Sequence, residues 1–231
     1  MPGPIASLIW YLGTALELAF VVCSIARNSF YRYFFLNLYL LLTVGTSVAR
    51  HLILGWFGLN SSQYRYMYFY TDALLTLALY LALISLYLRV FGELNFGKHV
   101  RLLAVLLLLG TVIFSYAVVA QSAGRLSTLF AYELSQNLYF VGLVLTYLLW
   151  GAVIKLRETR TRLVQFILAL GVYFSAYAAG YALLNLESKY SVVLTIGPAL
   201  GCLLPLSWTI TMWRHSEDSR LVPAQLVSVH R

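Results

Sequence analysis

The chain has 231 residues, of which 61% are hydrophobic and 10% are charged, and its mean hydropathy is +0.80. A soluble domain carries about 25% charged residues, so this composition excludes a soluble globular protein and leaves no room for a sizeable domain outside a membrane. The sequence predicts an all-α domain in residues 1–213, an integral membrane bundle of seven transmembrane helices. A short cytoplasmic tail, which we expect to be disordered, follows in 214–231.

Apolar stretches of about 20 residues or more follow one another along the chain, separated by short polar loops. Each is long enough to cross ~30 Å of hydrocarbon as a helix. The expected spans are residues 5–26, 32–57, 66–90, 100–121, 127–154, 163–186 and 190–213.

Positive charge is sorted between alternate loops. Of the 16 lysine and arginine residues, twelve lie in or beside the loops after the first, third and fifth spans or in the tail, and three lie in the opposite loops. Because short cytoplasmic loops are enriched in Lys and Arg, this split predicts that the N-terminus is outside and the C-terminus inside. It also accounts for the net charge of +8 without a nucleic-acid partner, since the sequence shows no basic face or base-stacking module.

The sequence lacks the motifs of known membrane-bundle chemistries. A retinal protein needs a lysine in the last span, and residues 190–213 hold none. A membrane zinc hydrolase needs several histidines within the spans, where His51 is the only one, and no HExxH motif occurs. Two cysteines, Cys23 and Cys202, are too few for a metal set or a disulfide framework. We therefore expect no enzymatic activity, no metal and no cofactor, and the lipid bilayer as the immediate partner.

Tyrosine occurs at every second position along residues 64–70, at the start of the third span. A period of two fits a strand, so one interpretation is a short extended lip over an external pocket. The other, which we favour, is a belt of interfacial aromatic residues leading into the third helix.

Small residues mark the last two spans as closely packed. Gly171, Ser175 and Ala179 recur every four residues in the sixth span, and Gly197 and Gly201 form a GxxxG pair in the seventh. Because small side chains let neighbouring backbones approach, we expect helix contacts here, within one chain rather than between two copies. The sixth span also carries a tyrosine stripe on a second face: Tyr173, Tyr177 and Tyr181.

Ionisable residues inside the spans are the main functional signal, because a charge in hydrocarbon is costly and usually faces the bundle interior. They are Glu17, Arg50, Asp72 and Glu133, with His51 next to Arg50. At ~1.5 Å per residue, Arg50, Asp72 and Glu133 each lie ~9–10 Å from the outer ends of their spans, and Glu17 lies deeper, at ~18 Å.

Other polar residues share a helix face with the acids of the third and fifth spans. Thr76 shares a face with the acid of the third span, and Gln136 and Asn137 do so in the fifth. The pattern predicts a polar cavity in the outer half of the bundle, lined by the second, third and fifth helices, with Glu17, Tyr177 and Tyr181 at its floor and wall. Three interpretations stay open: an ion pair of Arg50 that only braces the helices, a ligand pocket, and a proton or ion path.

Arg50 late in the second span, the tyrosine-rich start of the third span with its Asp72, and the sequence YLRVFGELNFGKHVRLL at 87–103 together resemble small uncharacterised bacterial seven-helix proteins. The resemblance covers most of the chain and implies a multi-pass protein of the bacterial inner membrane. The topology is also similar to the seven-helix input modules of bacterial sensors. Those modules continue into a cytoplasmic kinase or cyclase domain, whereas this chain stops at Arg231, so we expect signal output to need a separate partner.

The expected function is non-enzymatic binding or sensing of a small ligand through the outer cavity, with a separate cytoplasmic or membrane protein as partner. One alternative is a transporter or proton-coupled carrier that uses Glu17, Asp72 and Glu133. Another is an accessory subunit of a larger membrane complex.

The charge split generates a test of orientation. With the native cysteines replaced, single cysteines are introduced at Ser62 and at Thr159, and intact cells are treated with a membrane-impermeant thiol reagent. We expect labelling at position 62 only, and at both positions after lysis. Labelling of intact cells at position 159 alone would show that the N-terminus is inside, opposite to the prediction.

Overall fold

The computed structural model describes residues 4–58, 61–91, 97–120, 126–157, 160–186 and 191–216. Residues 217–231 of the expected tail lie outside the described residues, and so does the packing around Gly197 of the predicted GxxxG pair.

Seven α-helices make up the described part of the chain, so the predicted all-α class is confirmed. Their bounds follow the apolar stretches, because a helix satisfies its own backbone hydrogen bonds and is therefore stable in hydrocarbon. The helices are α1 (Pro4–Ala26), α2 (Phe34–Phe57), α3 (Ser62–Val90), α4 (Gly97–Ala120), α5 (Leu126–Lys155), α6 (Thr161–Leu186) and α7 (Ser191–Arg214).

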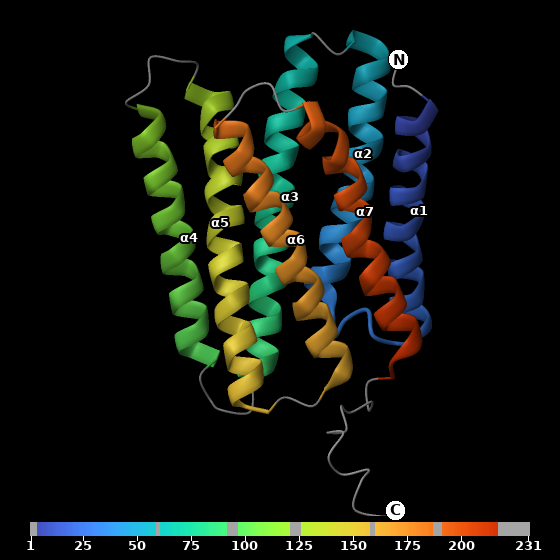
Figure 1. Cartoon of the computed structure of the whole chain (residues 1–231), viewed down its shortest axis with the longest axis vertical. Coiled ribbons are helices and arrows are strands. Elements are labelled where there is room, and N and C mark those ends of the chain that lie inside the picture. Colours follow the sequence, from blue (N-terminus) through green and yellow to red (C-terminus); the bar gives the residue numbers. More distant parts are fainter. Residues whose placement is uncertain are drawn as a thin grey trace, which may run out of the picture.

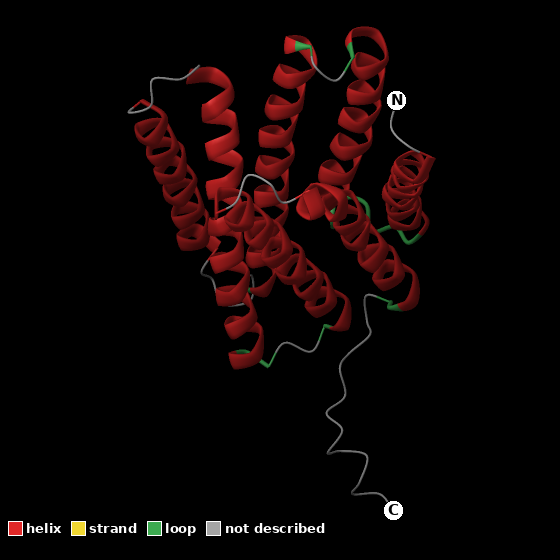
Figure 2. Ribbon diagram, turned by 45° about the horizontal axis from the view of Figure 1, so that its top comes forward, coloured by secondary structure: helices red, strands yellow, loops and turns green. Residues whose placement is uncertain are grey.

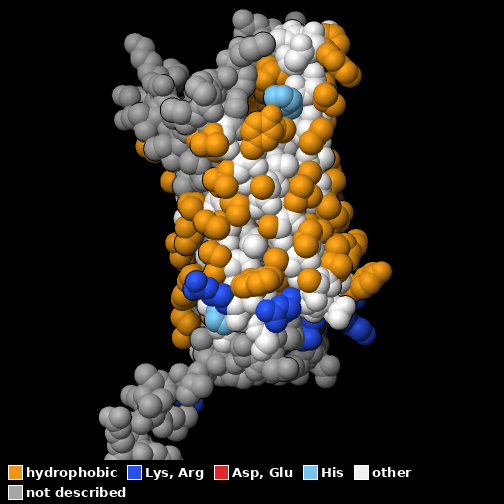
Figure 3. All heavy atoms as spheres, turned by 90° about the vertical axis from the view of Figure 1, so that its right-hand side faces the viewer, with side chains coloured by type: hydrophobic (Ala, Val, Ile, Leu, Met, Phe, Trp, Pro, Cys, Tyr) orange, Lys and Arg blue, Asp and Glu red, His pale blue; other side chains and the backbone are white. Residues whose placement is uncertain are grey.

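The helices have the dimensions of membrane spans. Within the described residues, α1 to α6 are each long and apolar enough to cross a bilayer, which supports a multi-pass membrane protein. In Figure 3, apolar side chains spread over the middle of the visible face, and Lys and Arg gather towards the end from which the chain continues beyond α7. The C-terminal ends of α1, α3, α5 and α7 lie together at this end (Figure 1), which we call the basic end.

Six helices form a ring, and α4 lies outside it. The order of contacts around the ring is α1, α2, α3, α5, α6 and α7, with α7 closing against α1, while α4 packs on α5 and α3. Figures 1 and 2 both show α4 at the edge of the bundle. Accordingly, α4 exposes a long run of side chains, among them Leu102, Leu106, Leu109 and Ile113.

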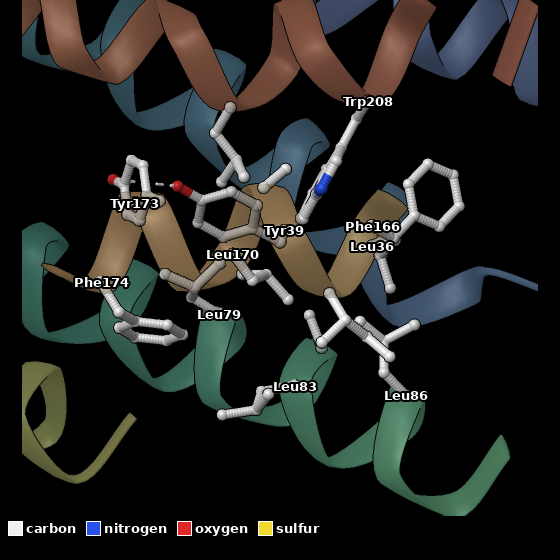
Figure 4. Packing of buried hydrophobic residues seen from close by; sticks show 14 of the residues in the cluster. Leu36, Tyr39, Leu79, Leu83, Leu86, Phe166, Leu170, Tyr173, Phe174 and Trp208 are labelled. Carbon is white, nitrogen blue, oxygen red and sulfur yellow. Dashed lines mark hydrogen bonds between the residues drawn. The ribbon is translucent and has the colours of Figure 1, made fainter. Parts of the chain in front are cut away.

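The core lies where α2, α3, α6 and α7 meet (Figure 4). Trp208 of α7 and Phe166 of α6 are fully buried, and Tyr39 of α2 is nearly so. The ring of Trp208 is in edge contact with both of the others. Because lipid tails are as apolar as these side chains, the stabilisation comes from close van der Waals packing rather than from removal of water.

Tyr64–Tyr70 are helical, and the extended alternative is wrong. α3 begins at Ser62, four residues earlier than predicted, because the Ser61 side chain caps the helix by accepting a hydrogen bond from the Tyr64 backbone N–H at 3.1 Å. In a helix, residues four apart share a face, and Tyr66 stacks on Tyr70 with an interplanar angle of 18°.

The basic end is held together by Arg162, which is only 3% exposed. Its Nε donates to the His215 carbonyl at 3.1 Å, and its Nη1 donates to the Ser29 hydroxyl at 3.2 Å. Close by, Arg27 Nη2 donates to the Trp213 carbonyl at 2.6 Å. These bonds tie the start of α6 and the turn after α1 to the end of α7.

Close approach of α5 and α6 depends on Gly142. A Cβ atom at this position would lie 2.3 Å from a ring carbon of Phe174, which is buried. The small-residue face of α6 meets α5 as well, since a Cβ at Gly171 would lie 3.3 Å from the Thr146 methyl. A Cβ at Gly201 would meet the Tyr177 hydroxyl at 3.5 Å, an ordinary contact.

We predict opposite effects for alanine at two glycines of α5. Gly142→Ala should lower stability by about 1–3 kcal/mol, because the new methyl collides with a ring that has no room to move. Gly151→Ala, the matched control, has nothing within 4 Å of the new Cβ and should be neutral or stabilising by up to about 1 kcal/mol. Thermal unfolding in detergent compares them, and equal melting temperatures would contradict the close contact.

Candidate functional site

Arg50 of α2 is anchored on α3. Its Nε donates to the Thr71 hydroxyl at 2.6 Å, and its Nη2 donates to the Tyr68 carbonyl at 3.0 Å. The guanidinium also lies 4.5 Å from the centre of the Tyr68 ring, a cation–π distance. Within the described chain Arg50 forms no direct ion pair with Asp72 or Glu133, although an ion pair was one expectation. Hydrogen bonds of Arg50 connect α2 with α3 instead.

Asp72 presents its carboxylate to α5 and α6. The Tyr181 hydroxyl donates to Oδ2 at 3.2 Å, and Ser135 of α5 lies beside the same carboxylate. The charge of Arg50 acts on it from the α2 side. Groups from four helices thus converge on one carboxylate, and we call this set the Asp72 centre: Arg50, Thr71, Asp72, Ser135 and Tyr181.

Tyrosine rings of α5 and α6 extend from the Asp72 centre into the bundle. Tyr139 lies 5.5 Å from Tyr181 and is stacked on Tyr177 at 5.1 Å, measured between ring centres. Further along, the Tyr173 hydroxyl lies 3.4 Å from the Tyr39 hydroxyl of α2 (Figure 4). The predicted tyrosine stripe of the sixth span therefore faces the bundle interior.

Three polar atoms of α1 and α5 are buried without a hydrogen-bond partner among the described residues. They are Ser135 Oγ, Gln136 Oε1 and Glu17 Oε2. Ser135 is close to Asp72, yet its hydroxyl makes no hydrogen bond of good geometry with the carboxylate. Such atoms are rare in folded proteins and mark places where water, an ion or a ligand completes the hydrogen bonding.

Glu17 lies apart from the Asp72 centre. It is 9% exposed in the middle of α1, which packs on α7 and α2. Its carboxylate is within electrostatic range of Tyr39 and Cys202. It therefore lies near the far end of the tyrosine stripe rather than directly below Asp72.

Two predicted site residues have local roles. His51 is exposed and stacks on Trp10 of α1, with 4.7 Å between ring centres. Thr76 donates to the Asp72 backbone carbonyl at 2.8 Å, so it is linked to Asp72 through its own helix.

The polar residues of α5 divide between two neighbouring helices. Asn137 donates to the Ser115 hydroxyl of α4 at 3.0 Å. Glu133 lies one turn earlier, on the side of α5 that carries Asn137. Ser135, in contrast, faces α3. The structure therefore brings Arg50, Asp72 and this serine together and places Glu133 and Asn137 apart from them.

Two grooves of the structure lie away from Arg50. One of about 420 Å³ runs between α6 and α7 and is lined mostly by apolar side chains such as Val172, Leu203 and Leu206. Another, of about 260 Å³, lies at the basic end between the start of α2 and the last turns of α3.

Sequence reasoning missed Thr71 and Ser135, the hydroxyls that flank Asp72. Serine and threonine are common in membrane helices, where they often bond only to their own backbone. Thr71 does this as well, donating to the Met67 carbonyl at 2.6 Å. No spacing pattern distinguishes such residues from those that also serve a neighbouring helix.

Comparisons with protein families, curated proteins and solved structures found no match. The function is therefore argued from the geometry of the site itself.

The anchoring of Arg50 generates a double-mutant prediction. Arg50→Met and Thr71→Val should each destabilise the protein, and the double variant should lose less than the sum, by about 1–2 kcal/mol, because both changes remove one charge-assisted hydrogen bond. Arg50→Met combined with Asn137→Leu, on the α4 side, is the control and should be additive to within about 0.5 kcal/mol. Thermal and denaturant unfolding in detergent measure both cycles, and equal coupling in the two would refute the anchor.

Proposed function

We propose that the chain is a seven-span protein of a bacterial inner membrane, with its N-terminus outside, that binds or senses a small polar ligand at the Asp72 centre. The observation that carries the proposal is the partly buried Asp72 carboxylate beside Ser135, whose Oγ is buried without a hydrogen-bond partner in the described residues. Polar groups in hydrocarbon are costly and are usually kept for function.

The chemistry of the centre favours a ligand that donates hydrogen bonds. The carboxylate of Asp72 is an acceptor, and the Ser135 hydroxyl can donate or accept. Arg50 is engaged by Thr71 and Tyr68, so it holds α2 against α3 and does not neutralise the carboxylate through a direct ion pair. The adjacent tyrosine rings offer apolar faces to the body of a ligand.

α3 offers a route from the Asp72 centre to the basic end. It contacts α2, α4, α5 and α6, and it runs from the turn that bears Asp72 to Arg89 in its last turn. A ligand that shifts α3 against these neighbours alters the surface at the basic end, where a separate protein partner can read the change. This step needs two packings of α3 that the ligand distinguishes.

A proton-coupled carrier is a second candidate, supported by Glu17. This buried acid has an unpartnered Oε2 and lies near Tyr39, whose hydroxyl is 3.4 Å from that of Tyr173. The tyrosine stripe then connects this region with Asp72 at its other end. Intramembrane acids arranged along polar side chains are typical of proton paths.

A binding site must be reachable from water, and this can be tested at Ser135. In a background without native cysteines, we expect Ser135→Cys to react with a small cationic methanethiosulfonate reagent in proteoliposomes. Ser115→Cys, equally buried at the α4–α5 interface, is the matched control and should react at least tenfold more slowly.

The Asp72 charge should attract the cationic reagent. Adding Asp72→Asn to Ser135→Cys should therefore slow the reaction with the cationic reagent and leave the reaction with a neutral reagent of similar size unchanged. Equal rates at positions 135 and 115 would contradict a pocket and leave the Asp72 centre as a structural brace.

A further inference from the structure

A second polar site lies at the basic end, far along α3 from the Asp72 centre. It is the groove of about 260 Å³ between the start of α2 and the last turns of α3, which we call the basic groove. Arg32, Ser85 and Arg89 line it together with aromatic rings that include Phe34 and Phe35. Two guanidinium groups and a hydroxyl thus face one space.

The arginines of this groove are positioned by their surroundings. The Arg89 guanidinium lies 4.5 Å from the centre of the Tyr33 ring, and this tyrosine is 2% exposed. A third arginine, Arg160, donates to the Arg89 carbonyl at 3.2 Å and brings further positive charge to the same end. A guanidinium presents a planar fork of donors that matches the oxygens of a phosphate.

The level of the groove in the bundle matches that of lipid headgroups. Tyr31 beside Arg32 is 90% exposed, and Phe34 and Phe35 are also exposed. Aromatic rings of this kind lie at the boundary between hydrocarbon and water. The groove is apolar where Leu88 lines it and cationic at the arginines, which is the distribution of polarity along a phospholipid from its chains to its phosphate.

We propose that the basic groove binds the phosphate of an anionic phospholipid, with Arg32 and Arg89 contacting the phosphate and the adjacent rings contacting the upper acyl chains. Basic pockets between membrane helices on the cytoplasmic side are known to hold such headgroups. The site is independent of the Asp72 centre. The attachment of lipid at the α2–α3 junction fixes the start of α2 against the end of α3.

The test uses the full-length protein purified in a mild detergent and native mass spectrometry. Phosphatidylglycerol and phosphatidylcholine with identical chains are added in equal amounts. We expect the wild type to retain the anionic lipid several-fold better. Arg32→Gln should weaken that retention about fivefold, and Arg32→Gln with Arg89→Gln should weaken it further, because each change removes a guanidinium that contacts the phosphate in the groove and a contact of this kind contributes a factor of about this size.

Arg101→Gln is the matched control, because Arg101 is an exposed arginine at the start of α4, outside the groove. It should leave lipid retention unchanged. Arg32 is exposed as well, so the single variant keeps the test valid if loss of Arg89 impairs folding.

Three results would overturn the proposal. They are equal retention of the two lipids by the wild type, an equal loss in Arg101→Gln, and displacement of the bound lipid by glycerol phosphate at a concentration equal to that of the lipid. The last would assign the groove to a soluble phosphate. Failure of this test leaves the Asp72 centre unaffected, because that site is probed at Ser135 by thiol reactivity.

Discussion

The high cost of an unpartnered polar group in hydrocarbon is the constraint on which this structure depends. Arg50 meets it by binding a hydroxyl and a carbonyl of α3. Arg162 meets it by joining the turn after α1 to the end of α7. Asn37 meets it in part, because its side-chain N–H donates to the Ser24 hydroxyl of α1 at 3.0 Å while its Oδ1 is buried without a partner in the described residues. These three side chains each fix the position of one helix against another.

Packing of aromatic side chains also fixes how the helices are placed and rotated against one another. α6 occupies the centre of the aromatic core, with Phe166 against Trp208 of α7 at one level and Phe174 against Tyr139 of α5 at another. The Phe174 ring fits because the position opposite is Gly142. Such contacts fix the rotation of α6, and this rotation turns the tyrosine stripe inward and places Tyr181 on Asp72.

The extent of the helices was predictable from the sequence because hydropathy and span length are one-dimensional properties. The level of Arg50 and Asp72 was predictable for the same reason, since depth follows from the rise per residue. The rotation of each helix was not. Asn137 and Ser135 are two residues apart in a short polar stretch of α5, and only packing decides that one meets α4 and the other α3. Arg162 lies just before the predicted sixth span, so hydropathy places it in a loop. Hydropathy does not show that the end of α7 covers this arginine and accepts its hydrogen bond.

The proposed function requires that the Asp72 centre hold a bound polar molecule. The most direct measurement is an experimental structure in lipid nanodiscs at a resolution that shows ordered water. The account predicts non-protein density within hydrogen-bond distance of both the Asp72 carboxylate and Ser135 Oγ. A dry contact, in which the Ser135 hydroxyl bonds directly to protein atoms and no density lies between the helices, would contradict it.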